Sequence, residues 1–164
     1  MNIFYLARCP QKSAMLMCDK HIVKMILESA QMLCTAHHVN GTLLLKTEIY
    51  KPAYKNHPST KWARESAEQY KWLYKHFCTL CDEYTRRYGK VHTTDQKLRS
   101  ILFIHPTEFD YIGFTPPPKC MPDIYKKGHT VFAYRKYYAN AKKHFAKYTN
   151  TPVPYFLRSS YYHI

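Results

Sequence analysis

The apolar side chains between Pro58 and Tyr88 follow the repeat of an α-helix, and this repeat is the strongest constraint on the fold. Their spacing alternates strictly between four and three residues, at Ala63, Ala67, Tyr70, Tyr74, Phe77, Cys81, Tyr84 and Tyr88. A face with this repeat packs against another helix. Pro58 suits a first helical turn and Gly89 a position just past the end, so we predict one long helix from Pro58 to Tyr88.

A second long helix is predicted from Ser13 to His38, with Ser13 as its N-cap and Asn40-Gly41 as its stop. Its apolar positions keep helical spacing at Ile22, Val23, Ile26, Leu27, Ala30, Leu33 and Cys34. Polar residues form one narrow stripe along the same helix, at His21, Lys24, Glu28, Gln31, Thr35 and His38. Such a stripe is either a solvated face or the lining of a site.

The rest of the chain is predicted to be shorter helices and loops. Thr94-Asp95 would cap a third helix that runs to about Phe103, and a fourth is predicted over Tyr134–Tyr148. Residues 105–130 hold half of the ten prolines, and Thr151-Pro-Val-Pro154 begins an irregular tail. We therefore predict an all-α fold: a single compact domain, residues 1–164, of three to four helices with a long Pro-rich loop and an irregular C-terminal tail.

The charge balance indicates a polyanionic partner. The chain carries 25 Lys and Arg against 11 Asp and Glu, a formal net charge of +14. Tyrosines interleave with the basic residues, most densely over residues 134–148, and aromatic planes stack on unpaired bases. We expect double-stranded DNA with a flipped or kinked base as the partner, and a solvated basic face is the alternative.

The composition argues against several other classes of protein. Only four glycines are present and no Gly-rich phosphate loop is visible, so we expect no nucleotide cofactor, and no cofactor of another kind is indicated. No apolar run is long enough to span a membrane, and the first ten residues are too short for a secretory signal. Cys78-x-x-Cys81 lacks a second pair for zinc, so we expect reduced thiols and no metal.

The polar stripe is the sharpest candidate for a catalytic site. Spacings of three, four and seven place His21, Lys24 and Glu28 on one helix face. A carboxylate beside a lysine and an imidazole can act as a general acid or base. On a merely solvated face, the Lys24–Glu28 pair would contribute only about 0.3–0.5 kcal/mol to stability.

The same residues carry a family resemblance. Asp19-Lys-His21, with Glu28 seven positions after the histidine, resembles the first helix of the phage pyrimidine-dimer DNA glycosylases of the endonuclease V type. The order of later features is similar: Lys55-Asn-His-Pro58 precedes a long helix that closes on Arg87-Tyr-Gly89, and Tyr134-Arg-Lys-Tyr-Tyr138 resembles the family's DNA-contacting tail. The block Cys18–Glu28 is also similar to a group of phage proteins.

The resemblance implies a DNA glycosylase/lyase that acts on a damaged or modified pyrimidine. The α-amine of Met1 would attack the sugar C1′ and form a Schiff base, and Glu28 would transfer protons, with Lys24 and His21 as its neighbours. A phage-type enzyme of this kind would act as a monomer in the cytoplasm of the host cell, without a membrane partner.

Two departures from the family leave the chemistry open. The family exposes a small residue after methionine removal, whereas the bulky Asn2 follows Met1 here. The arginines that flank the family's glutamate are absent, since Leu27 and Gln31 lie in that neighbourhood. Lys20 or Lys24 could therefore supply the amine. A group transfer onto a modified pyrimidine and a non-enzymatic DNA-binding role are the alternative functions.

The DNA-contacting residues are predicted from the basic and aromatic segments. They are Lys20, Lys55, Asn56, His57, Arg87, Lys90, Tyr134, Arg135, Tyr137, Tyr138 and Lys142. Tyr137 or Tyr138 would stack in the gap that an extruded base leaves. His57 would bind phosphate at a helix start, or simply cap that helix.

Overall fold

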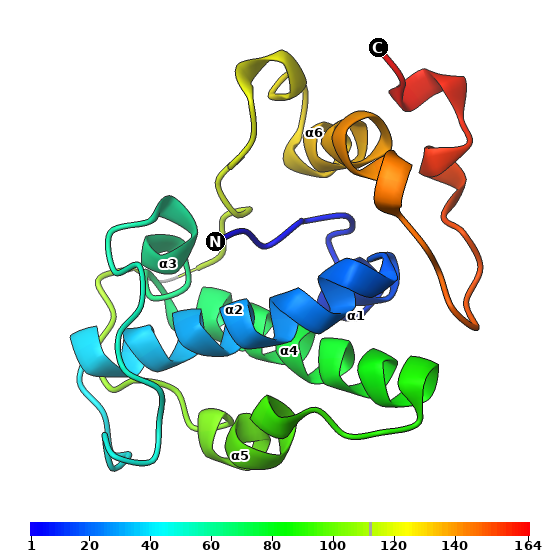
Figure 1. The fold of residues 1–164 in the computed structure, drawn as a ribbon. Coiled ribbons are helices and arrows are strands. Elements are labelled where there is room, and N and C mark those ends of the chain that lie inside the picture. Colours follow the sequence, from blue (N-terminus) through cyan, green and yellow to red (C-terminus); the bar gives the residue numbers. More distant parts are fainter. Residues whose placement is uncertain (112) are drawn as a thin grey trace.

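The computed structural model describes residues 1–111 and 113–164, and it is built from helices (Figure 1). The α-helices are α1 (Pro10–Met15), α2 (Asp19–Val39), α3 (Pro58–Trp62), α4 (Ala67–Tyr88), α5 (Thr93–Leu102) and α6 (Thr130–Tyr137). Short 3₁₀ turns lie at Asp123–Tyr125, Lys143–Phe145, Tyr155–Leu157 and Ser160–Tyr162, and a π-helical turn at Tyr138–Lys142. The described residues contain no strand, so the predicted all-α class is confirmed.

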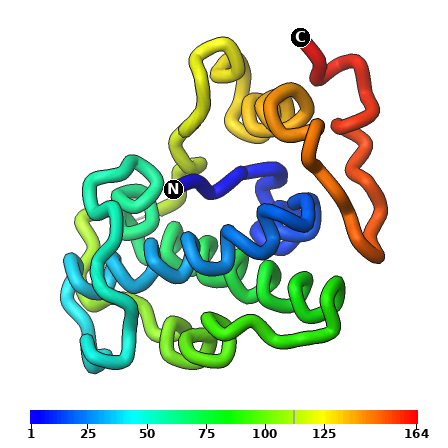
Figure 2. The backbone as a smooth tube through the Cα atoms, viewed as in Figure 1, coloured from blue at the N-terminus to red at the C-terminus, as the bar shows by residue number. Residues whose placement is uncertain are grey.

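Helices α2 and α4 form the centre of the molecule. They lie side by side, with α1 and α5 packed against the pair and α6 beyond the N-terminal segment (Figures 1 and 2). Ile22 and Ile26 of α2 and Leu73 and Phe77 of α4 are fully buried in the hydrophobic core. Among the described residues, no helix is long and apolar enough to cross a membrane.

The predicted helix Ser13–His38 is wrong at its start, because the chain forms two helices there. Arg87 donates hydrogen bonds to the carbonyl oxygens of Met15 (3.2 Å) and Met17 (2.9 Å), and Tyr148 donates to that of Leu16 (3.0 Å). These three carbonyls would otherwise bond the next helical turn, so side chains from distant segments interrupt the helix. Ser13 is not an N-cap: its buried hydroxyl bonds Phe4 and Leu6.

The predicted helix Pro58–Tyr88 is likewise divided into α3 and α4. Ser66 caps α4, since its hydroxyl accepts a hydrogen bond from Gln69 N at 3.1 Å. The predicted ends are confirmed: Pro58 occupies the first turn of α3, and Gly89 ends α4 with a φ of 67°, which favours glycine.

The later elements also differ from the predictions in their bounds. The N-cap of α5 is His92, whose Nδ1 accepts from Thr94 N at 3.1 Å, rather than Thr94-Asp95. The fourth predicted helix, Tyr134–Tyr148, begins earlier, at Thr130, and passes into the π-helical turn after Tyr137. The predicted Pro-rich loop runs from α5 to α6, and its described residues include the short turn Asp123–Tyr125.

Candidate active site

The N-terminal segment lies across α2 and brings the first residue to Glu28. The Met1 amine is 3.8 Å from Glu28 Oε2, and Asn2 N donates to the same oxygen at 3.2 Å. Lys24 Nζ lies 3.5 Å from the other oxygen, Oε1. The Glu28 carboxylate is therefore held between a terminal amine and a lysine, which is the arrangement expected from the sequence.

The exposure of these groups shows which atoms face solvent. The Met1 side chain is 1% exposed and Glu28 is 13% exposed, whereas the Lys24 side chain is 63% exposed. Because Met1 as a whole is only half-buried, its exposed part is the backbone end that carries the amine. The methionine side chain anchors the terminus, and the amine remains accessible.

A cavity of about 590 Å³ opens beside this amine. It is lined by Met1, Val23, Lys24, Leu27, Glu28, Gln31, Tyr54, His92 and Thr94. Its size suits a small organic group such as a nucleobase and sugar. The middle of the predicted polar stripe therefore lines this cavity. Further along α2, Thr35 and His38 are covered by the loop before α3, where they bond Ala53 and Tyr50.

His57 is a further titratable group close to the amine. It caps α3, and its Nδ1 accepts a hydrogen bond from Ser59 N at 3.1 Å, so the neutral ring carries its proton on Nε2. Burial lowers its pKa most, the Met1 ammonium lowers it further, and Glu28 opposes both. Capping is what the contacts of His57 show, and its binding to phosphate stays a prediction.

His21 does not neighbour Glu28 as predicted. It is buried, stacks on the Phe4 ring at 4.3 Å and bonds Tyr138 Oη through Nδ1 at 2.7 Å. Burial, and then the charges of Lys142, Lys24 and Lys20, lower its pKa to about 3. The N-terminal segment covers this end of the stripe, so His21 is a neutral packing residue outside the cavity lining.

Three predicted DNA contacts are contradicted because their side chains are buried. Tyr134 and Tyr138 have no exposed surface, and the Arg87 side chain has none either. Arg87 instead bonds Asp19 and Glu83. A base or phosphate cannot reach these groups in this arrangement.

The other predicted DNA contacts remain at least partly accessible. Lys55, Asn56 and Lys90 are exposed, and Arg135 is half-buried, with its Nε bonded to Leu6 O at 2.9 Å. Tyr137 is half-buried.

Lys20, Lys24 and Lys142 gather at the start of α2. Lys20 Nζ lies 4.8 Å above the Phe145 ring, and Lys142 Nζ lies 4.8 Å above that of Tyr137. All three lysines act electrostatically on the same His21 ring. They form a basic surface that reaches the Glu28 cavity through Lys24.

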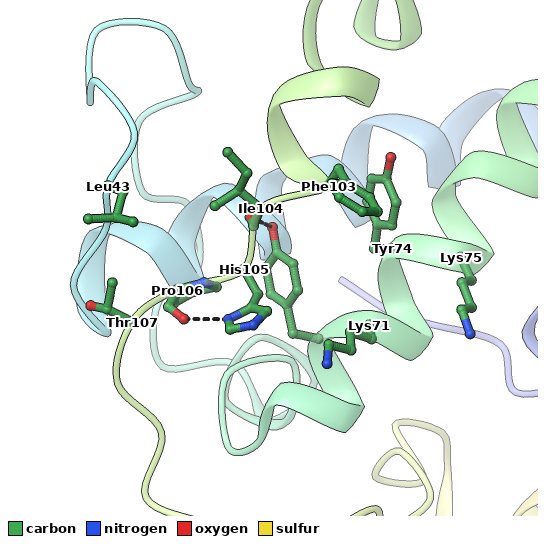
Figure 3. Close-up of a pocket in the computed structure, with 10 residues that line it drawn as sticks. Leu43, Lys71, Tyr74, Lys75, Phe103, Ile104, His105, Pro106 and Thr107 are labelled. Atoms are coloured by element: carbon green, nitrogen blue, oxygen red, sulfur yellow. Dashed lines mark hydrogen bonds between the residues drawn. The ribbon is translucent and has the colours of Figure 1, made fainter.

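A second large cavity has a different character. It measures about 580 Å³ and lies between α4 and residues 103–107, where Tyr74, Phe103 and Ile104 present apolar surface (Figure 3). Lys71 and Lys75 are on its rim, but none of the described residues that line it is a carboxylate. It therefore lacks the acid–base pair that the Glu28 cavity has.

Sequence reasoning missed Asn2, Tyr54, His92 and Thr94 as members of the site. Tyr54 is 69% exposed at the cavity and has a φ of 46°. A positive φ is uncommon for a tyrosine and often marks a functional position. The signal in the sequence was the position of Tyr54 at the head of the basic segment that ends in Pro58.

Comparison with known proteins identifies one similarity. A family model described as pyrimidine dimer DNA glycosylase matches residues 1–97. No curated protein and no solved structure matches the chain. The matched range holds Met1, Glu28 and His57, whereas the Pro-rich loop and α6 lie outside it.

Proposed function

The chain belongs to the pyrimidine dimer DNA glycosylase family, and from this premise we propose that it removes a damaged or modified pyrimidine from DNA and then cleaves the strand. The observation that carries the proposal is the position of the Met1 amine, 3.8 Å from the Glu28 carboxylate and beside an open cavity. An accessible amine next to a proton acceptor is what covalent glycosylase chemistry requires.

The reaction starts with attack of the neutral amine on the sugar C1′. A bond forms between the amine nitrogen and C1′, and the glycosidic bond breaks, with its electron pair leaving on the base. Glu28 takes a proton from the amine and returns it to the ring oxygen O4′ as the C1′–O4′ bond breaks, which gives a protonated Schiff base and leaves Glu28 ionised again. Glu28 then removes a C2′ proton, and the 3′ phosphate leaves by elimination.

Met1 is a better candidate for the nucleophile than either nearby lysine. An α-amine ordinarily loses its proton about two pH units below a lysine side chain, so more of it is neutral at pH 7. Lys24 is largely exposed, and the Lys20 ammonium lies over the Phe145 ring. We therefore assign Lys24 and Lys20 to phosphate contacts.

Basic and aromatic side chains around the cavity suggest where the DNA backbone and the extruded base would lie. Lys20, Lys24 and Lys142 would neutralise backbone phosphates at the start of α2, and Lys55 and Asn56 would do so beside α3. Tyr54 is an exposed aromatic ring at the mouth of the cavity, so we assign it the stacking on the extruded base. It takes the place predicted for the buried Tyr138.

Borohydride trapping tests the proposal directly, because it fixes a Schiff base permanently. Wild-type protein is incubated with a duplex that contains an abasic site or a cyclobutane pyrimidine dimer, and the adduct is located by peptide mass mapping. We expect the adduct on Met1. Glu28→Gln should slow turnover about 10²–10⁴-fold. Glu48→Gln, a matched change on an exposed loop residue, should leave turnover unchanged.

The alternatives predict other results. An adduct on Lys20 or Lys24 would reassign the nucleophile. If wild-type protein binds DNA but never forms an adduct or releases a base, the non-enzymatic DNA-binding role replaces the glycosylase.

A further inference from the structure

The Asn2 side chain joins three segments that are far apart in the sequence. Its Nδ2 donates to Cys120 O at 2.8 Å, and its Oδ1 lies 3.0 Å from the Tyr134 hydroxyl. The same hydroxyl is 2.6 Å from Pro118 O and accepts from Cys120 N at 3.3 Å. The Pro-rich loop and α6 therefore meet at the second residue of the chain.

Asn2 also fixes the backbone that follows it. Its Oδ1 accepts hydrogen bonds from Ile3 N at 2.8 Å and from Phe4 N at 3.3 Å. Phe4 has a φ of 55°, a left-handed conformation that costs about 1–2 kcal/mol for a residue other than glycine. Such a conformation persists only where the surroundings enforce it.

We propose that Asn2 and Tyr134 form a clamp that positions the N-terminal amine against Glu28. The reactive role of the amine rests on the function proposed above, but the clamp itself is a structural claim. Tyr134 acts through Asn2 and is a positioning residue, in place of the DNA contact that the sequence predicted.

A clamp is needed because a chain terminus is ordinarily the most mobile part of a protein. A nucleophile must stay close to its attack geometry, and a displacement of about 1 Å can slow a reaction roughly 100-fold. Three features immobilise the terminus here: the buried Met1 side chain, the Asn2 contacts, and the Phe4 ring stacked on His21.

The clamp gives a role to residues outside the family match. Cys120 and Tyr134 lie beyond residue 97, where the matched range ends. Glu28 and the amine come from the matched part, and their alignment depends on the unmatched part. Through Cys120 and Tyr134, the C-terminal region therefore helps to hold the amine in place.

The test compares two buried tyrosines that each lose a hydroxyl. Tyr134→Phe removes the contact with Asn2. Tyr70→Phe is the matched control, because Tyr70 is equally buried and its hydroxyl bonds His37 and Leu102, far from the terminus in the sequence. Asn2 stays unchanged, since a small residue at that position would also promote removal of Met1.

Three measurements are made on each full-length variant: hydrogen exchange of the Ile3 and Phe4 amides, the borohydride trapping rate at saturating DNA, and the DNA Kd. For Tyr134→Phe we expect faster exchange at both amides, trapping slowed about 10–100-fold and Kd unchanged. For Tyr70→Phe we expect wild-type exchange and trapping despite a lower Tm.

The outcomes separate the clamp from the proposed reaction. If Ile3 and Phe4 exchange as slowly in Tyr134→Phe as in wild type, the clamp is disproved. Equal slowing of trapping in Tyr70→Phe would also disprove it, because general destabilisation would then explain the loss. If the amides are freed in Tyr134→Phe but wild-type protein never cross-links, the clamp holds and the glycosylase proposal fails.

Discussion

Two charged clusters involve residues of α2, and they differ in how closely their charged groups contact their partners. At the start of the helix, Arg87 pairs with Asp19 at 3.0 Å and with Glu83 at 3.1 Å, and its side chain is wholly buried. Nine residues further on, Glu28 faces the Met1 amine at 3.8 Å and Lys24 at 3.5 Å beside an open cavity. The first cluster is tight and closed, and the second is loose and open.

We take this difference to distinguish a structural cluster from the cluster to which we assign the proposed reaction. The closed cluster joins α2 and α4 to the C-terminal segment, since Asp19 also accepts hydrogen bonds from Thr149 N and Oγ1. Both carboxylates of this cluster, Asp19 and Glu83, accept more than one hydrogen bond from other side chains. The carboxylate of the open cluster can exchange its partners during a reaction, because its contacts are longer and a cavity adjoins them.

The largest expected effect is a contrast between two variants: Glu28→Gln should affect mainly activity, and Glu83→Gln should affect mainly stability. Glu28→Gln removes the proton acceptor but keeps the shape, so activity should fall about 10²–10⁴-fold while stability changes by about 1 kcal/mol or less. DNA affinity should hold or rise, since a negative charge leaves a basic surface. Glu83→Gln should lower Tm and leave the kcat of the folded protein unchanged. Steady-state kinetics and thermal unfolding of both variants measure these effects. If both variants lost a similar share of kcat, the two clusters would not differ in function.

Arg87→Ala should have the largest effect on stability. It leaves Asp19 and Glu83 without their buried cation and frees the carbonyls of Met15 and Met17. Breaking a buried pair of this kind costs about 3–5 kcal/mol. Urea unfolding of Arg87→Ala beside Arg86→Ala, whose side chain is far more exposed, checks the prediction. A loss below about 1 kcal/mol for Arg87→Ala would mean that the cluster is not closed in solution.

Local sequence patterns predicted the open cluster better than the closed one. Periodicity placed Lys24 and Glu28 on one face correctly, because they belong to one regular helix. Arg87 was predicted to contact DNA, since no local pattern shows that Asp19 meets it. The break near Leu16 escaped prediction for the same reason: the groups that cause it, Arg87 and Tyr148, are distant in the sequence.

The aromatic residues show a second limit of sequence reasoning. Alternating tyrosines and lysines around Tyr134 and Tyr138 indicated a DNA-binding surface, but composition does not tell which side of a short helix is buried. Both rings are buried, and both hydroxyls bond the N-terminal half. No sequence pattern pointed to Asn2, because its contacts with Cys120 and Tyr134 form only in the folded chain.

His21 lies between Asp19 and Glu28 in the sequence. Its pKa indicates whether its surroundings are closed, like those of Asp19, or open, like those of Glu28. The folded protein holds its pKa at about 3, below the usual 6.5, so the unfolded chain binds the proton first on acidification. Stability is therefore complete above about pH 6.5 and falls as the pH drops, by roughly 2 kcal/mol at pH 5. Urea unfolding of wild type and His21→Asn across this range measures the effect. If NMR showed that His21 titrates near pH 6.5, its ring would be accessible to solvent, as the groups of the open cluster are.

Tyr54 tests whether the open cluster faces an extruded base. Tyr54→Ala should weaken binding to damaged or mismatched duplex by about 1–3 kcal/mol, because stacking on the base is lost. Binding to intact duplex should change little. Fluorescence anisotropy at fixed salt, with Tyr161→Ala as an exposed tyrosine control from the C-terminal tail, measures the difference. Equal losses on both duplexes would show that Tyr54 does not stack on an extruded base.

The smallest expected effect on stability is that of Lys24→Ala, although Lys24 pairs with Glu28, the proposed acid–base residue. Its ammonium is largely exposed and 3.5 Å from Glu28, so water and salt weaken the pair to about 0.3–0.5 kcal/mol. Its influence on DNA should be larger, because a lost phosphate contact reduces the salt dependence of binding by about one unit in the log–log slope. Kd measured from 50 to 200 mM salt, with Lys12→Ala as an exposed lysine from α1, tests this. An unchanged slope with a stability loss above about 1 kcal/mol would make Lys24 part of a closed structural cluster, and the contrast between the two ends of α2 would no longer hold.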